Sequence, residues 1–228
     1  KNSTYDKNFI VAMEEVQRAF NLREDQVIIK TGIPESDKCY DEAMNLVDAG
    51  CNIVFADSFG HEAHLIKAAK TEKGKKVLFA HATGTKAHTE NLPNFVNAFA
   101  SIYEGRFLAG VAAGLKLNEM IAAGKFTAEE AKMGYVGAYT YAEVISGYTS
   151  FYLGAKSVCP TVTMDVQFTG SWYDETAEYN AANALINGGC KLISQHADSM
   201  GAPNACESAG IPNVSYNGST FEACPKTF

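Results

Sequence analysis

Hydrophobic and polar positions follow two different periods along this chain. Residues 6–20 place apolar side chains at helical spacing, with Phe9, Met13, Val16 and Phe20 among them. Short continuous apolar runs, such as residues 52–56 and 76–80, are typical of strands that are buried on both faces of a sheet. The pattern therefore predicts a doubly wound α/β fold, in which helices cover parallel sheets.

The same pattern predicts an ordered series of elements. In the first part of the chain we expect helices at 6–20, 36–48 and 61–69 and strands at 26–30, 52–56, 76–80 and 95–100. A long helix over 103–123 follows, and then the alternation restarts. Strands are expected at 133–137, 161–168, 191–195 and 213–216, with helices at 142–156, 174–187 and 203–208. This restart divides the chain into an N-terminal α/β lobe, 1–102, and a C-terminal α/β lobe, 103–228.

Two segments far apart in the chain resemble each other. Residues 49–60 and 188–201 each contain a helix-ending glycine, a cysteine, an apolar strand and then Ala-Asp-Ser-x-Gly. Duplication explains the similarity, and shared βα turn chemistry is the alternative. Because ligands of open α/β sheets bind outside the carboxyl ends of the strands, two such lobes predict a ligand cleft that closes by a hinge motion.

Composition and motifs narrow the function. Among 228 residues, 26 acidic side chains outweigh 19 basic ones, so the net charge of −7 argues against nucleic acid as a partner. His61 and His64 stand three residues apart, which is not the spacing of a zinc protease helix, and no third ligand is evident. Phosphate loops and hydrolase elbows are absent from the sequence, and so is an obvious acid–base pair. We therefore expect no catalytic residue, no metal and no cofactor.

Six scattered cysteines do not form a disulfide framework. Cys39 and Cys51 stand at opposite ends of one predicted helix, too far apart to bridge. Cys51 and Cys190 each begin an apolar strand and are read as buried thiols. A Cys206–Cys224 bond is left open.

Aromatic and short polar residues gather where predicted strands end. Most of them have a simpler explanation, since Asp6, Ser58, Asp174 and Asp198 are all good helix caps. Trp172 is different, because it lies in a loop between Ser171 and Tyr173. An aromatic face beside a few polar groups suits a flat heterocycle or a sugar.

Four segments resemble the basic membrane protein family, the substrate-binding lipoproteins of ABC transporters that include purine nucleoside receptors. They begin at Tyr103 (Tyr-Glu-Gly-Arg-Phe-Leu-Ala-Gly-Val-Ala-Ala-Gly), Gly134 (Gly-Tyr-Val-Gly-Ala), Gly170 (Gly-Ser-Trp-Tyr-Asp) and Gln195 (Gln-His-Ala-Asp-Ser-Met-Gly). The resemblance implies a type I periplasmic-binding-protein fold, an outer-face lipid anchor, an ABC permease as partner and a purine-like ligand. Compared with the family, this chain looks truncated at both ends.

The resemblance also implies roles for individual residues. Tyr5 matches an aromatic residue that stacks on the base, Asp6 matches its polar neighbour, and Trp172 matches a stacking residue from the second lobe. Nucleoside receptors carry a base-reading Asp near Thr83 and an Asp-x-Asp-Gln segment where this chain has Tyr216-Asn-Gly-Ser. A free nucleobase or another heterocycle therefore remains an alternative to a nucleoside. The expected ligand-binding residues are Tyr5, Asp6, Ser58, Phe59, Thr83, Asn97, Trp172, Asp198 and Asn217.

The sequence thus predicts an extracytoplasmic, lipid-anchored protein that binds a purine nucleoside or nucleobase between two lobes, with Tyr5 and Trp172 enclosing the ring. The alternative is a ligand-sensing module coupled to a signalling partner instead of a permease. An α/β enzyme is the least favoured interpretation.

Overall fold

The computed structural model describes residues 3–227, and it divides the chain into two compact units. The first unit is Phe9–Ala100, and the second joins the segment that ends at Asn8 to the chain from Ser101 onward. Helix α1, Thr4–Ala19, therefore begins in the second unit and continues in the first.

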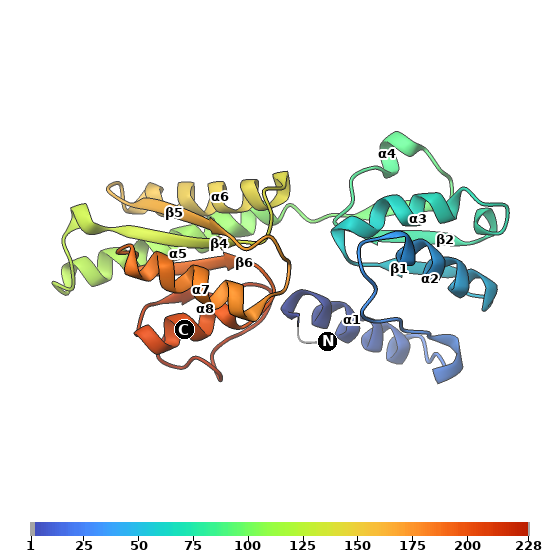
Figure 1. Cartoon of the computed structure of the whole chain (residues 1–228), viewed down its shortest axis with the longest axis horizontal. Helices are drawn as coiled ribbons and strands as arrows, with labels where there is room; N and C mark the ends of the chain where they lie inside the picture. The colour runs from blue at the N-terminus through green and yellow to red at the C-terminus, as the bar shows by residue number, and fades with distance from the viewer. Residues whose placement is uncertain (1–2, 228) are drawn as a thin grey trace. The chain divides into compact units, whose positions relative to one another are not determined.

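The first unit is built on a sheet of three parallel strands in the order β1-β2-β3 (Figure 1). The strands are β1 (Ile53–Ala56), β2 (Leu78–Ala82) and β3 (Phe95–Ala98), and the helices are α2 (Asp37–Asp48), α3 (Glu62–Ala69) and α4 (Ala87–Glu90). Val54, Phe79 and Phe95 point to one face and form a core with α2 and α3. The alternate residues Ile53 and Phe55 remain 62% and 48% exposed.

The second unit has four parallel strands in the order β5-β4-β6-β7. The strands are β4 (Lys132–Gly137), β5 (Thr163–Phe168), β6 (Leu192–His196) and β7 (Asn213–Val214); the helices are α5 (Ile102–Ala122), α6 (Ala142–Val158), α7 (Glu175–Asn187) and α8 (Gly201–Ala209). Because βαβ connections are right-handed, the helix of each connection lies on a face set by the direction in which the chain moves along the sheet. The elements thus repeat the strand–helix alternation that the sequence predicts.

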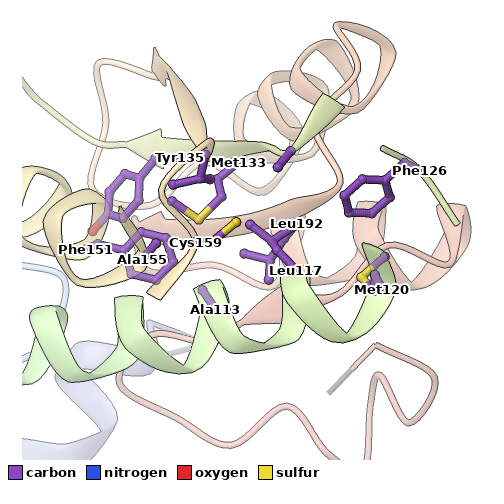
Figure 2. Close-up of a cluster of buried hydrophobic side chains, with 12 residues drawn as sticks. Ala113, Leu117, Met120, Phe126, Met133, Tyr135, Phe151, Ala155, Cys159 and Leu192 are labelled. Atoms are coloured by element: carbon purple, nitrogen blue, oxygen red, sulfur yellow. The ribbon is translucent and has the colours of Figure 1, made fainter. Parts of the chain in front are cut away.

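Both faces of this second sheet are covered. Tyr135 and Leu192 point to the face that packs against α5 and α6, as Figure 2 shows for the larger cluster. Their neighbours Val136 and Ile193 point to the opposite face, where α7 and α8 complete a second cluster. Because successive strand residues face opposite ways, continuous apolar strands are needed here, and this explains their sequence.

One predicted element is wrong. Residues 26–30 were expected to form a strand, but a short 3-10 helix, Glu24–Gln26, is followed by residues 27–30 outside any strand. Ile28 and Ile29 are 44% and 51% exposed. The first sheet of the described residues consists of β1, β2 and β3, and none of these strands pairs with residues 27–30. Without a paired strand the backbone of this segment makes no ladder hydrogen bonds, so no strand forms.

All six cysteines are free thiols. The disulfide bond that the sequence left open between Cys206 and Cys224 is therefore not formed. Cys39 lies near the start of α2 and Cys51 just beyond its end. Cys190 is buried, and Cys51 is half-buried. None of the helices within residues 3–227 combines the length and apolar character required to cross a membrane.

Candidate functional site

The carboxyl ends of β1, β2 and β3 bring together three of the predicted residues of the first unit. Nε2 of the buried His81, on β2, lies 2.8 Å from the carbonyl oxygen of Ser58. The Thr83 amide donates to Ala98 O on β3 at 2.9 Å, and the Ala87 amide donates to Asn97 Oδ1 at 2.8 Å. Asn97 also lines an open hollow with Gly84, Thr85, Ala87, His88 and Phe99.

Glu35 organises the loop after β1, and sequence reasoning missed it. The Ser58 hydroxyl donates to Glu35 Oε1 at 2.6 Å, and the Gly60 amide donates to the same oxygen at 2.7 Å. The Ser58 side chain thus binds Glu35, while Phe59 begins the 3-10 helix Phe59–His61. Whether Ser58, Phe59, Thr83 or Asn97 contacts a ligand stays a prediction.

In the second unit, backbone hydrogen bonds join the segments that carry the other predicted residues. The Thr4 amide, at the start of α1, donates to Asp198 O at 2.9 Å, and the Asp198 amide donates to Trp172 O at 2.8 Å. Asn8 Nδ2 donates to Asn217 O at 2.8 Å. The first turn of α1, which contains Tyr5 and Asp6, therefore lies beside the loops of Trp172, Asp198 and Asn217.

Trp172 belongs to a cluster of aromatic rings. Its ring centroid lies 5.3 Å from that of Tyr139 and 6.1 Å from that of His196. The rings of Tyr139 and Tyr141 stack at 5.0 Å, and His196 lies 4.7 Å from Tyr216. These residues follow or end β4, β5, β6 and β7, so they gather at the carboxyl edge of the sheet, where open α/β sheets bind ligands.

Buried polar atoms lie in the same region. Arg106 on α5 is 4% exposed, and its guanidinium carbon lies 4.2 Å from the ring centroid of Tyr216. Arg106 Nε and Nη2, Tyr135 Oη and Trp172 Nε1 are buried, and they find no hydrogen-bond partner among the described residues. Since buried polar groups are normally hydrogen-bonded, this group of atoms suits a bound polar ligand.

The titratable groups of this region are strongly perturbed. Burial, together with the charges of Asp6 and Glu178, raises the pKa of Asp198 to about 8. Burial, and next the charge of Arg106, lowers the pKa of His196 to about 3, so the imidazole is neutral near pH 7. Burial also raises the pKa of Glu143, whose Oε1 lies 3.8 Å from His196 Nε2. Perturbed groups of this kind are typical of functional sites.

Several of these residues were not predicted from sequence: Arg106, Tyr135, Tyr139, Tyr141, Glu143, His196 and Tyr216 as a contacting ring. One sequence signal was available for Arg106, a charge directly before the apolar run 107–115. For His196 the signal was a histidine at the end of an otherwise uncharged strand. The others carry no comparable signal, since tyrosine is common both in cores and on surfaces.

The capping interpretation holds for one of the four residues considered. Asp174 Oδ1 accepts a hydrogen bond from the Ala177 amide at 2.9 Å, at the start of α7. Asp6 instead lies inside the first turn of α1, where its amide donates to Ser3 Oγ. Ser58 makes no side-chain cap, and Asp198 precedes α8 by too many residues to cap it. The described residues also contain no group of three or more His, Cys, Asp or Glu side chains placed to hold a metal ion.

Comparison with solved structures identifies the class of fold. An ABC transporter solute-binding protein from Conexibacter woesei superposes with a TM-score of 0.69 at 19% sequence identity, covering 98% of this chain and 71% of that protein. At this identity the likeness concerns the fold alone. The two parallel α/β units are those of the type I periplasmic-binding-protein fold, as the sequence predicted.

Sequence comparison then gives the family. Residues 2–219 match the family described as PnrA-like ABC transporter substrate-binding proteins. A purine-binding protein of Brucella abortus is 35% identical over 179 residues, which are 78% of this chain and 46% of that protein. A Haloferax volcanii protein, whose name describes an ABC transporter glucose-binding protein, is 30% identical over 207 residues, 90% of this chain and 48% of that protein.

The chain belongs to the PnrA-like family of ABC transporter substrate-binding proteins, and the resemblance drawn from its four segments is confirmed. This is a family of extracytoplasmic solute-binding proteins, not of enzymes. The chain spans about half the length of the curated relatives it matches.

Proposed function

We propose that the protein binds a purine nucleobase or nucleoside outside the cytoplasm and delivers it to an ABC permease, held at the membrane by a lipid anchor. The observation that carries the ligand class is the aromatic cluster of Trp172, Tyr139, Tyr141, His196 and Tyr216 beside buried donors that have no partner in the described part of the chain. Flat rings supply stacking area, and polar atoms at their edges fix the orientation of a heterocycle.

The names of the two relatives point to different ligands. The Brucella abortus relative is named as a purine-binding protein, whereas the Haloferax volcanii relative is named for glucose. A sugar also stacks on aromatic rings, and glucose therefore serves as the competing ligand in the test. These five tyrosine, histidine and tryptophan rings favour the purine, because both faces of a purine are flat and aromatic, whereas a pyranose is puckered and carries hydroxyl groups around its ring.

Trp172 gives a direct test, since it is the only tryptophan of the chain. The chain is titrated with adenine, hypoxanthine, their nucleosides and glucose. Only the purines should change the tryptophan emission. Trp172→Ala should weaken purine binding, measured by calorimetry, by about 5-fold to 100-fold, because stacking on an aromatic side chain contributes ~1–3 kcal/mol per base.

Tyr173 provides the matched control. It is the next aromatic residue in the same loop and is 39% exposed, so Tyr173→Ala should leave purine affinity unchanged. A folded protein that binds glucose and no purine would overturn the proposed ligand class. Equal losses in the two variants would instead show that the loop matters and Trp172 stacking does not.

A further inference from the structure

Arg106 is a buried cation without a direct ionic partner among the described residues. It lies in the first part of α5 and is 4% exposed, and no carboxylate of the described residues approaches its guanidinium within ion-pair distance. Its guanidinium carbon lies 4.2 Å from the ring centroid of Tyr216 and 5.7 Å from that of Tyr135. Cation–π contacts stabilise the charge in part, but Nε and Nη2 remain without acceptors among these residues.

Two other buried polar atoms without partners among the described residues, His196 Nδ1 and Tyr135 Oη, lie beside one glycine. A Cβ added at Gly147 would lie 3.2 Å from His196 Nδ1 and 3.6 Å from Tyr135 Oη, so both atoms border the space beside this glycine. Neither atom has a hydrogen-bond partner in the described part of the chain. The ring of His196 also lies 4.7 Å from Tyr216, the same ring on which Arg106 stacks.

Donors outnumber acceptors in this group. Arg106 and Trp172 offer N–H groups only, and Tyr135 offers a hydroxyl. Burial holds the pKa of His196 low, so its neutral imidazole has one donor and one acceptor. Asp198 and Glu143 both have raised pKa values, so protonation of either carboxyl would add a further donor. A ligand that satisfies this site must therefore present acceptors.

Building on the proposed function, we propose that Arg106 determines specificity and selects a 6-oxopurine over a 6-aminopurine. An oxo group at C6 and the ring nitrogen N7 present two adjacent acceptors, the pattern that an arginine fork binds with two parallel hydrogen bonds. A 6-aminopurine places an N–H₂ donor in the position of the oxo group, where it would face the N–H groups of Arg106.

The test compares hypoxanthine with adenine on the full-length protein and on its Arg106→Lys variant, by calorimetry. Lysine keeps the positive charge and loses the planar fork. We expect the wild-type protein to bind hypoxanthine about 10-fold to 100-fold more tightly than adenine, the range that one good bidentate pair gives. Arg106→Lys should remove most of that preference by weakening hypoxanthine binding, with little change for adenine.

Two further variants separate a ligand contact from a structural role. Arg18→Lys is the matched control, because Arg18 is exposed near the end of α1, and it should change neither affinity. Tyr135→Phe removes only a buried hydroxyl that has no hydrogen-bond partner within residues 3–227. It should leave the melting temperature close to that of wild type and weaken hypoxanthine binding several-fold.

The outcomes distinguish this inference from the proposed function. If the wild-type protein binds adenine as tightly as hypoxanthine, or if Arg106→Lys weakens both equally, Arg106 does not select the oxo group, although the protein is still a purine binder. If neither the two bases nor their nucleosides bind the folded protein, the proposed function itself is wrong.

Discussion

At the scale of single residues, the buried Asp198 of the candidate site makes the free energy of unfolding depend on pH. Burial and the charges of Asp6 and Glu178 raise its pKa to about 8, whereas an unfolded Asp titrates near ~3.9. Between these two values the folded state binds more protons than the unfolded state, so this group lowers the free energy of unfolding as pH rises.

Asp198→Asn removes this penalty. We expect the variant and the wild-type protein to melt at similar temperatures near pH 4 and the variant to melt several degrees higher near pH 8, because a pKa difference of one unit corresponds to ~1.4 kcal/mol. Thermal melts followed by circular dichroism at both pH values measure this. Asp41→Asn, at an exposed position of α2, is the control, and a gain that is equal at both pH values would contradict the prediction.

The role of a site residue could be predicted from the sequence only where its side chain differs clearly from its neighbours in the chain. Trp172 and Asp198 were found because each stands in a short polar loop after a predicted strand. Arg106 was missed because its role depends on Tyr216 and Tyr135, which are 110 and 29 positions away in the chain. Pairings of this kind are made by the fold and have no local pattern.

At the scale of elements, the contact between α5 and α6 depends on glycine. A Cβ at Gly110 on α5 would overlap the carbonyl oxygen of Phe151, and one at Gly154 on α6 would overlap that of Phe107. The two helices therefore pack with their backbones in close approach above the Tyr135 and Leu192 core.

Gly110→Ala should lower the free energy of unfolding by about 1–3 kcal/mol, the range for overpacking a core. Gly105→Ala in the same helix is the matched control, since the nearest atom to its added Cβ is Ile102 Cδ1 at 3.9 Å. There the better helix propensity of alanine should stabilise the protein by up to about 1 kcal/mol. Urea unfolding of both variants measures the difference, and equal effects would show that the helices can separate without cost.

Most elements were predictable because their signals are local. The spacing of apolar residues and the glycines that end helices predicted α1 to α8, except the short α4. They also predicted strands β1 to β7 to within a few residues. The failure at residues 26–30 has a physical cause, since a strand exists only when another strand pairs with it. The apolar character of Ile28 and Ile29 is visible in sequence, but the absence of a neighbour is not.

At the scale of the whole molecule, the two units differ in how well they bury their own apolar surface. The second sheet is covered on both faces. The first sheet is covered by α2 and α3 on one face. On its other face, α1 contacts the sheet through Phe9, whose ring centroid lies 5.6 Å from that of Phe55. Ile53, Phe55, Leu78 and Val96 nevertheless remain between 38% and 62% exposed. An apolar surface that is covered only in part promotes association.

Expression of the two units as separate fragments tests this difference. Residues 101–228 contain both clusters that cover the second sheet, so this fragment should be monomeric and should unfold cooperatively, although it loses the Thr4 hydrogen bond to Asp198. Residues 9–100 should self-associate, and Ile53→Lys with Val96→Lys should reduce this because both side chains are exposed on the partly covered face. Size-exclusion chromatography with light scattering measures the outcome. A monomeric, cooperatively folded 9–100 fragment would show that its exposed face does not drive association.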